Sequence, residues 1–414
     1  MTDFYQRTTC RLCEHTDLRK VISLIPTPPG NHFVPQSKKS EHQAAYPLDV
    51  YFCRNCAHLQ LGVVVDPKIL YQQNYSYVSG TSPVFVEYLK NYAYQFVRSY
   101  SLRAGSLVVD IGSNDGTALR FFAEQGFKIL GVDPATEIAE AANAAGIPTV
   151  CAFFDQQHAE QFRQQYGAAQ LITSHNTFAH IDHLDSVVSG VRSWLADDGL
   201  LAFEVGYLFD VYQKLWFDTI YHEHLDFHSL KPLVQFLDRL DMQVIHAERV
   251  SPQGGSLHVI AQKKGGPRPV QSSVGELIEA ERAAGLHEET SFLRYADRIN
   301  EVKRELTVIV RRIKAERQTI AGFGAPTKAT TLLSYFELAD ALDFLVDENP
   351  LKQNLYSPGH HIPVYAADAI YQRKPDYVLI LAWNFAEDIM RRHHKFAEGG
   401  GHFILPMPRP AVVN

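Results

Sequence analysis

The sequence predicts an α/β protein in which a small cysteine-rich module precedes two larger strand–turn–helix units. Two Cys-x-x-Cys pairs fall within the first sixty residues. In two places, residues 106–126 and 319–333, a short apolar run is followed by a glycine-rich turn and then by a helical pattern. A chain of 414 residues is longer than a single hydrophobic core usually supports. We therefore expect three domains, over residues 1–70, 71–265 and 266–414.

The overall charge argues against a nucleic-acid partner. The chain carries a net charge of −7 and lacks the basic excess that holds a phosphate backbone. Its start, MTDFYQRTTCRLC, shows no basic and apolar leader, and no later apolar run is long enough to cross a bilayer. We therefore expect a cytoplasmic protein that binds neither nucleic acid nor membrane, with a monomer as the simplest state.

The two cysteine pairs predict a metal site. Cys10 and Cys13 form one pair and Cys53 and Cys56 form the other, with a proline-rich loop between them. Four thiolates on two such turns can reach the corners of a tetrahedron, which suits Zn²⁺. Surface thiols and redox-active pairs are the alternatives, but two motifs so close together favour zinc. Because the protein fills all four positions, we expect a structural ion, and we expect the remote Cys151 to be a small core residue.

The first glycine-rich turn predicts a cofactor site. Residues 106–111 read SLVVDI, and the turn GSNDGT that follows opens a helix whose first N–H groups can face a ligand. The next strand ends in Asp133, where a carboxylate commonly accepts hydrogen bonds from ribose hydroxyls. The same turn also serves nicotinamide and flavin cofactors. Asp110 separates these cases, because its carboxylate would repel a pyrophosphate but attract a cationic sulfonium; the alternative is a carboxylate that caps the helix.

The pattern Asp-x-Gly-x-x-x-Gly, followed by Val-Asp-Pro, resembles motif I of the class I methyltransferases, which have a Rossmann-like fold. This resemblance implies S-adenosylmethionine as the cofactor. Two more predicted strands should bring Asn176, His180 and Glu204 to the same cleft, because ligands of open α/β sheets bind beyond the carboxyl ends of the strands. The expected cofactor-binding residues are Asp110, Gly112, Asn114, Asp115, Asp133 and Asn176.

Residues 217–230, FDTIYHEHLDFHSL, concentrate histidine and other reactive side chains. These side chains are Tyr221, His222, Glu223, His224 and His228. A metal site is one interpretation, but the helical His-Glu-x-x-His spacing is missing. Packing of solvated rings is a second, and acid–base chemistry is a third, since the pKa of histidine lies near neutrality and a neighbouring carboxylate can orient the ring. For His222 and His228 we expect solvated or capping side chains.

The chain as a whole resembles the nucleotide-sugar C-methyltransferases, which act on TDP-linked ketodeoxysugars of the tetronitrose, novobiose and mycarose type. The resemblance rests on the paired cysteines, on DIGSNDG, NTFAHI and YHEHLDFHSL, and on residues 71–83 (YQQNYSYVSGTSP), 322–333 (GFGAPTKATTLL) and 350–364 (PLKQNLYSPGHHIPV). It implies methyl transfer from S-adenosylmethionine to carbon. It also implies that the sugar is surrounded by Tyr77, His180, Tyr221, Glu223 and His224.

This chemistry requires a base. A carbon next to a ketone is too weakly acidic to attack a methyl group unaided, so its proton must be removed and the enolate stabilised. We expect His224 to be the general base, oriented or tuned by Glu223. We expect Tyr221, His180 and Tyr77 to hold the keto oxygen or neighbouring hydroxyls. The sequence leaves open which sugar is used and whether C3 or C5 is methylated.

The C-terminal third repeats the strand–turn–helix pattern. An amphipathic stretch over residues 274–316 leads to TIAGFGAPTKATTLL, and LDFLVDE, DYVLILAW and HFILPMP predict further strands of a parallel sheet. We expect this second Rossmann-like domain to bind the nucleotide diphosphate through the turn at Gly324 and through Lys328 and Lys352. The alternative is a duplicated fold that only completes the cleft.

Two other functions are the competing hypotheses. A NAD-dependent oxidoreductase would use GFGAP as its cofactor turn, but the turn runs into a proline and the third spaced glycine of the usual fingerprint is missing. A non-catalytic scaffold would bind nucleotides without reaction. We favour the methyltransferase.

Overall fold

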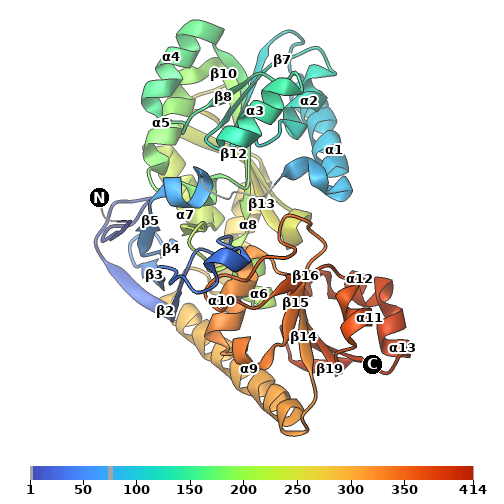
Figure 1. Cartoon of the computed structure of the whole chain (residues 1–414). Helices are drawn as coiled ribbons and strands as arrows, with labels where there is room; N and C mark the ends of the chain where they lie inside the picture. The colour runs from blue at the N-terminus through green and yellow to red at the C-terminus, as the bar shows by residue number, and fades with distance from the viewer. Residues whose placement is uncertain (1–2, 73–77, 414) are drawn as a thin grey trace.

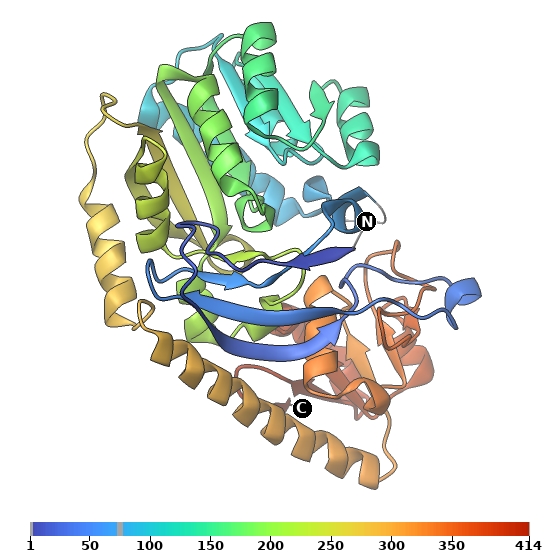
Figure 2. The same cartoon turned by 90° about the vertical axis from the view of Figure 1, so that its left-hand side faces the viewer.

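The computed structural model describes residues 3–72 and 78–413, which form three parts (Figure 1). A seven-stranded sheet with its helices forms the upper part, and the N-terminal module and the C-terminal domain lie below it, side by side. Figure 2 shows the long helix α9 (Glu289–Ala315) running beneath the sheet of the N-terminal module, where it contacts β2 (Leu18–Thr27).

The upper sheet is mostly parallel. Its order is β12-β13-β10-β9-β6-β7-β8, in which the strands from β10 to β8 run parallel and β13 and β12 close one edge antiparallel. The strands are β6 (Leu107–Ile111), β7 (Lys128–Asp133), β8 (Thr149–Cys151), β9 (Ala169–His175), β10 (Leu195–Gly206), β12 (Met242–Val250) and β13 (Ser256–Lys263). The central strands are covered on both faces, which is why their sequences read as continuous apolar runs.

Two helical layers cover this sheet, and alternate residues of β6 divide between them. Val108 packs with α1 and α2, whereas Val109 and Ile111 pack with α4, α5 and α7. The helices are α1 (Pro83–Tyr100), α2 (Thr117–Ala123), α3 (Thr136–Ala144), α4 (Gln156–Tyr166), α5 (Leu184–Trp194), α6 (Leu208–Lys214) and α7 (Leu230–Arg239). Because side chains alternate along a strand, Asp110 shares the face of Val108 and lies on the α1 side, at the carboxyl end of β6.

The N-terminal module contains a four-stranded antiparallel sheet of order β11-β4-β3-β2. The strands that belong to the module are β2, β3 (Tyr46–Cys53) and β4 (Leu59–Leu61), with β1 (Phe4–Gln6) and β5 (Val63–Val65) as a separate pair. The fourth strand, β11 (Asp226–Phe227), comes from the middle of the chain. The histidine-rich segment therefore runs directly into the sheet of the N-terminal module.

The C-terminal domain has a six-stranded sheet of order β16-β15-β14-β17-β18-β19, parallel except for β19. Its strands are β14 (Ile320–Phe323), β15 (Phe344–Val346), β16 (Val364–Tyr365), β17 (Tyr377–Ile380), β18 (His402–Leu405) and β19 (Ala411–Val413). One face packs against α11 (Ala369–Arg373), α12 (Ala386–Arg392) and α13 (His394–Glu398). On the other face, α9 and α10 (Thr327–Tyr335) share one hydrophobic core with the N-terminal module.

The α/β class and the two strand–turn–helix units are confirmed. The amphipathic stretch forms two helices, α8 (Ser272–Ala283) and α9, of which α8 packs against β12 of the upper sheet. The domain boundaries stay predictions. Within the described ranges, no helix combines the length and the apolar character that crossing a membrane requires.

The prediction that Cys151 lies in the core is wrong. Its side chain is exposed, because it ends the three-residue strand β8 at the edge of the sheet.

Candidate active site

The four cysteines of the N-terminal module form a compact cluster. All four Sγ atoms lie within 4.8 Å of one another, with 3.6 Å between Cys10 and Cys56 and 3.5 Å between Cys13 and Cys53. In each turn, the residue after the second cysteine has a positive φ and donates its N–H to the carbonyl of the first cysteine. Sulfur atoms bound tetrahedrally to zinc lie about 3.8 Å apart. The cluster therefore fits a zinc ion with four protein ligands.

The turn after β6 depends on glycine. Gly112 has a φ of 73°, and a Cβ there would lie 2.1 Å from Oγ1 of Thr177. Asp110 is buried at the end of β6, where its Oδ1 lies 3.9 Å from Nδ1 of His175, and this oxygen has no hydrogen-bond partner among the described residues. Burial raises the pKa of Asp110. Burial by itself would lower the pKa of His175, but the neighbouring carboxylate of Asp110 outweighs this effect, so the pKa of the ring is raised. A cationic ligand would stabilise the charged form of this buried carboxyl group, which burial otherwise disfavours.

The other predicted cofactor residues do not all face the same space. Asp133 accepts a hydrogen bond from the N–H of Asn114 at 2.9 Å, and both residues line a large cavity, as does Asn176. Asn176 has a φ of 57°, which turns the chain away from β9. Asp115 accepts a hydrogen bond from the N–H of Gly80 at 2.9 Å instead, so it fastens the segment before α1 to the glycine-rich turn.

The cavity has a volume of about 970 Å³ and connects the glycine-rich turn with the histidine-rich segment. This size is at the upper end of the range for ligand sites, as a site for a cofactor and a second substrate requires. Its lining includes Asp110, Asn176, His180, Tyr221, Glu223, His224 and Lys328. The N-terminal module contributes Asn31, so all three parts of the chain border the cavity.

His224 is held as a neutral ring in one tautomer. Its Nδ1 lies 2.7 Å from the carbonyl oxygen of Thr219, which can only accept, so Nδ1 carries the proton. Its Nε2 lies 2.8 Å from the hydroxyl of Tyr221, which donates to it. Burial lowers the pKa of His224 to about 4. At neutral pH the Nε2 atom is therefore unprotonated.

His180 lies beside this pair. Its ring centroid is 5.2 Å from that of His224 and 5.9 Å from that of Tyr71, which stacks on it. Burial, with a further effect of His224, lowers the pKa of His180 to about 3. The hydroxyl of Tyr71 donates to the backbone carbonyl of Glu223 at 3.4 Å. Sequence reasoning missed Tyr71, although it opens one of the segments that carry the family resemblance.

Glu223 makes no hydrogen bond to His224 among the described residues, so the orienting part of that expectation is wrong, whereas the tuning part stays a prediction. Oε1 of Glu223 accepts a hydrogen bond from Asn31 at 3.3 Å, while Oε2 has no partner among the described residues. Consecutive residues of this turn bond to different parts of the protein, and the ring has the two other partners described above. Burial raises the pKa of Glu223 to about 7. Asn31 also accepts a hydrogen bond from the hydroxyl of Thr327 on α10 at 2.8 Å. The sequence of its proline-rich loop did not predict that Asn31 contacts Glu223 and α10.

His222 and His228 are buried rather than solvated, contrary to the expectation. Nε2 of His222 lies 3.2 Å from the carbonyl oxygen of Tyr46, and the ring of His228 stacks on that of His58 with centroids 5.7 Å apart. Both rings pack the histidine-rich segment against the N-terminal module.

Of the residues predicted to bind phosphate, Lys328 lines the cavity. Its Nζ donates to Oδ1 of Asn384 at 2.8 Å and lies 3.6 Å from the buried carboxylate of Asp218. Burial lowers the pKa of Lys328, which Asp218 partly offsets. Lys352 and Gly324 lie off the cavity lining. Lys352 donates to a carbonyl of the turn before α10 at 2.9 Å, and Gly324 allows the φ of 87° in that turn.

The fold and the site define a class I methyltransferase that uses S-adenosylmethionine. Family models match three consecutive stretches: a zinc binding domain at residues 10–71, a methyltransferase domain at 85–247 and a C-methyltransferase C-terminal domain at 251–408. The chain is 34% identical over 406 residues to the C-methyltransferase NovU of Streptomyces niveus, covering 98% of this chain and 96% of NovU. The chain therefore belongs to this family of C-methyltransferases.

Solved methyltransferase structures align with less than half of the chain. The plantazolicin methyltransferase BpumL in complex with SAH covers 45% of this chain and 87% of its own, at 16% identity and a TM-score of 0.36. The magnesium protoporphyrin IX methyltransferase ChlM from Synechocystis PCC 6803 with bound SAH covers 43% and 83%, at 16% identity and a TM-score of 0.34.

The cofactors of this enzyme are thus S-adenosylmethionine and Zn²⁺. Asp110 and the turn at Gly112 offer the first a carboxylate and close backbone approach, and the four clustered thiols fit the second. Tyr77, the remaining predicted sugar-binding residue, lies outside the described residues.

Replacing Gly112 by alanine should weaken S-adenosylhomocysteine binding by about tenfold or more, because the new Cβ collides with Thr177. Gly126→Ala is the matched control, since Gly126 has a φ of 83° but a Cβ added there would meet no atom of the described residues within 4 Å. Calorimetry should show near wild-type affinity for this control and no binding of NAD. Unchanged affinity in Gly112→Ala would contradict the assigned cofactor turn.

Proposed function

We propose that this enzyme methylates a carbon next to the ketone of a TDP-linked 4-ketodeoxysugar, as a step of deoxysugar biosynthesis. The supporting observation is the cavity that His224, Tyr221 and Lys328 share with the glycine-rich turn. A carbon nucleophile needs a base within reach of its proton while the carbon itself faces the methyl donor. One cavity bordered by both groups of residues meets this requirement.

In this proposal His224 is the general base. Bound S-adenosylmethionine supplies an electrophilic methyl group. The C–H bond next to the ketone breaks, its proton moves to Nε2 of His224, and its electron pair forms an enolate. The enolate carbon would form the new C–C bond to the methyl group as the donor's C–S bond breaks and S-adenosylhomocysteine leaves. The hydroxyl of Tyr221 turns from Nε2 to the keto oxygen, and the neutral ring of His180 donates a second hydrogen bond. Tyr77 would bind a neighbouring sugar hydroxyl.

Glu223 has an electrostatic role in this scheme rather than an orienting one. When His224 takes up the proton, it becomes a cation in a buried site, which is costly without a counter-charge. The carboxylate of Glu223, the residue before it, supplies that charge. Its raised pKa places the change between the neutral and charged carboxyl near neutral pH.

We propose that Lys328 and the start of α10 hold the diphosphate of the donor sugar. The ammonium group borders the cavity, and it has one buried carboxylate beside it, Asp218. The negative charge of a diphosphate would stabilise the charged form of Lys328, which burial disfavours. Lys352 and Gly324 then contribute through the shape of the turn before α10.

We also propose that the enzyme is cytoplasmic and monomeric. The cytoplasmic location agrees with the four zinc-binding thiols, because thiols persist in a reducing compartment. The oxidoreductase alternative is not favoured. Its GFGAP turn lies inside the stretch that matches the C-methyltransferase C-terminal domain.

His224→Ala should slow deuterium exchange at the carbon next to the ketone by about 10²–10⁴-fold, because no group replaces Nε2. Exchange is followed by NMR with a TDP-linked 4-keto-6-deoxyhexose in D₂O, with S-adenosylhomocysteine in place of the methyl donor. His246→Ala is the matched control, since this residue of β12 lies away from the cavity. Equal exchange in His224→Ala and wild type would rule out His224 as the base.

The exchange rate should rise with pH through about 7, where Glu223 loses its proton. Below that pH the carboxyl is neutral and cannot stabilise a protonated His224, whereas above it the carboxylate can. His224 itself, with a pKa of about 4, adds no transition between pH 5 and 9. In Glu223→Gln the profile should be flat and low. A rise near pH 7 that persists in this variant would contradict the role of Glu223.

Lys328→Gln should weaken TDP binding by about tenfold and leave S-adenosylhomocysteine affinity unchanged, since a charge-assisted contact to phosphate is lost. Both affinities are measured by calorimetry. Lys374→Gln, an exposed position after α11, is the matched control. Equal TDP affinity in Lys328→Gln and wild type would place the diphosphate elsewhere.

A further inference from the structure

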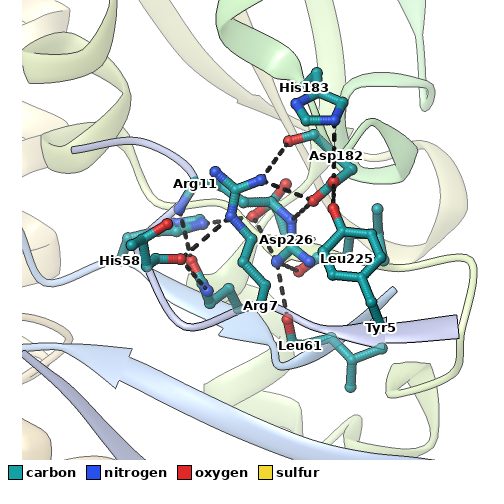
Figure 3. Close-up of polar contacts among 11 residues, drawn as sticks. Tyr5, Arg7, Arg11, His58, Leu61, Asp182, His183, Leu225 and Asp226 are labelled. Carbon is teal, nitrogen blue, oxygen red and sulfur yellow. Dashed lines mark hydrogen bonds and ion pairs between the residues drawn. The ribbon is translucent and has the colours of Figure 1, made fainter. Parts of the chain in front are cut away.

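One of the two residues between the cysteines of the first zinc turn is a buried arginine. Arg11 has a fully buried side chain that lies among Leu61, Asp182 and Leu225 (Figure 3). Its Nη1 donates to the carbonyl oxygens of Leu61 at 2.8 Å and Leu225 at 3.0 Å. Its Nε donates to Oδ1 of Asp182 at 2.9 Å. Zinc coordination needs none of these contacts, so the side chain serves another purpose.

Two carboxylates face this guanidinium, and each follows a histidine of the active site. Asp182 comes two residues after His180, and Asp226 comes two residues after His224, with its Oδ1 3.8 Å from Nη1 of Arg11. Both residues line the cavity, although the side chain of Asp226 is fully buried. Burial opposes their ionisation, yet Arg11 holds the pKa of both carboxyl groups below the usual range. The guanidinium thus contacts the two segments that carry the proposed catalytic rings.

The backbone of Leu225, the residue after His224, is fixed through both its N–H and its carbonyl group. The N–H of Leu225 donates to the carbonyl of Ala179 at 2.8 Å, which ties the two histidine segments together directly. The carbonyl of Leu225 accepts from Arg11 and from the N–H of Leu61. A shift of this peptide would move the ring of His224 relative to that of His180, and a displacement of about 1 Å can cost about 10²-fold in rate.

We infer that Arg11 is a positioning residue for proton abstraction, which sets the distance between His180 and His224 from within the zinc-binding turn. The inference rests on the proposed function for its catalytic consequence. It goes beyond that function because it makes the N-terminal module part of the catalytic machinery. Lysine cannot replace arginine here, because one ammonium group cannot reach Asp182 and the Leu225 carbonyl in the fixed fork of a guanidinium.

Arg239 on α7 supplies a matched control. It also contacts the first zinc turn, donating to the carbonyl of Leu12 at 2.8 Å and pairing with Glu14 at 3.1 Å. It makes these contacts from a partly exposed position, and both of these polar partners lie in the zinc turn, outside the two histidine segments. Arg239→Met therefore disturbs the turn alone.

The test compares Arg11→Lys, Arg11→Met and Arg239→Met in the full-length enzyme. Arg11→Lys keeps the charge beside the two carboxylates and guards against a failure of Arg11→Met to fold. We expect the kcat of deuterium exchange to fall about 10–100-fold in both Arg11 variants, with one zinc per chain, unchanged S-adenosylhomocysteine affinity and KM within about threefold. Arg239→Met should match the wild type. A normal kcat in Arg11→Lys, or a loss that only follows zinc content, would overturn the inference.

A second measurement needs no substrate. In protein labelled at the histidine Cε1 carbon, the NMR signals of His180 and His224, assigned by His→Gln variants, should shift in Arg11→Lys and stay in place in Arg239→Met. Unshifted signals in Arg11→Lys would overturn the positioning role. If wild-type enzyme exchanges no proton of the keto sugar, the proposed function fails, and this measurement still decides the role of Arg11.

Discussion

Two residues of β11 pair with β4, and this short ladder joins the histidine-rich segment to the N-terminal module. The ladder begins two residues after His224 and three residues after Cys56, so one pairing links the proposed base and the cysteine cluster. A two-residue strand is too short to fix its register by backbone bonds alone. The buried contacts around it supply the rest: Arg11 reaches across to Asp226, and His58 lies 2.7 Å from the same carboxylate. The position of the His224 ring thus depends on packing between parts of the chain that are far apart in sequence.

Burial at this junction also sets the protonation of the site. His180 and His224 are neutral because desolvation disfavours their charged forms, while Glu223 holds its proton up to about pH 7 for the same reason. A neutral imidazole can accept a proton, and a carboxylate nearby can stabilise the cation that results. Water in the cavity would remove both effects by screening the charges. The three surrounding parts therefore shape the acid–base properties as well as the geometry.

The sequence predicts the local features of this architecture well. The strand–turn–helix units, the glycine turn at Gly112 and the four clustered cysteines follow from short patterns, and the structure contains them. It predicts the partners of individual side chains poorly. Adjacency in sequence predicts Glu223 beside His224, but the partner of Glu223 is Asn31, 192 positions away. The predictions for His222 and Cys151 are wrong for the same reason, since exposure depends on which elements cover a residue.

Two of the contacts that escaped prediction share one origin, because Asn31 and Arg11 both belong to the N-terminal module. Each enters the site from a loop whose sequence is dominated by another signal, prolines in one case and zinc-binding cysteines in the other. A tetrahedral zinc site rigidifies such a loop without a large core of its own. A rigid loop can present a long arginine side chain with little loss of conformational entropy at the moment of reaction. If Arg11 positions His224 as inferred, the metal site contributes to catalysis through the residues between its ligands, although the ion itself has no open position for a substrate.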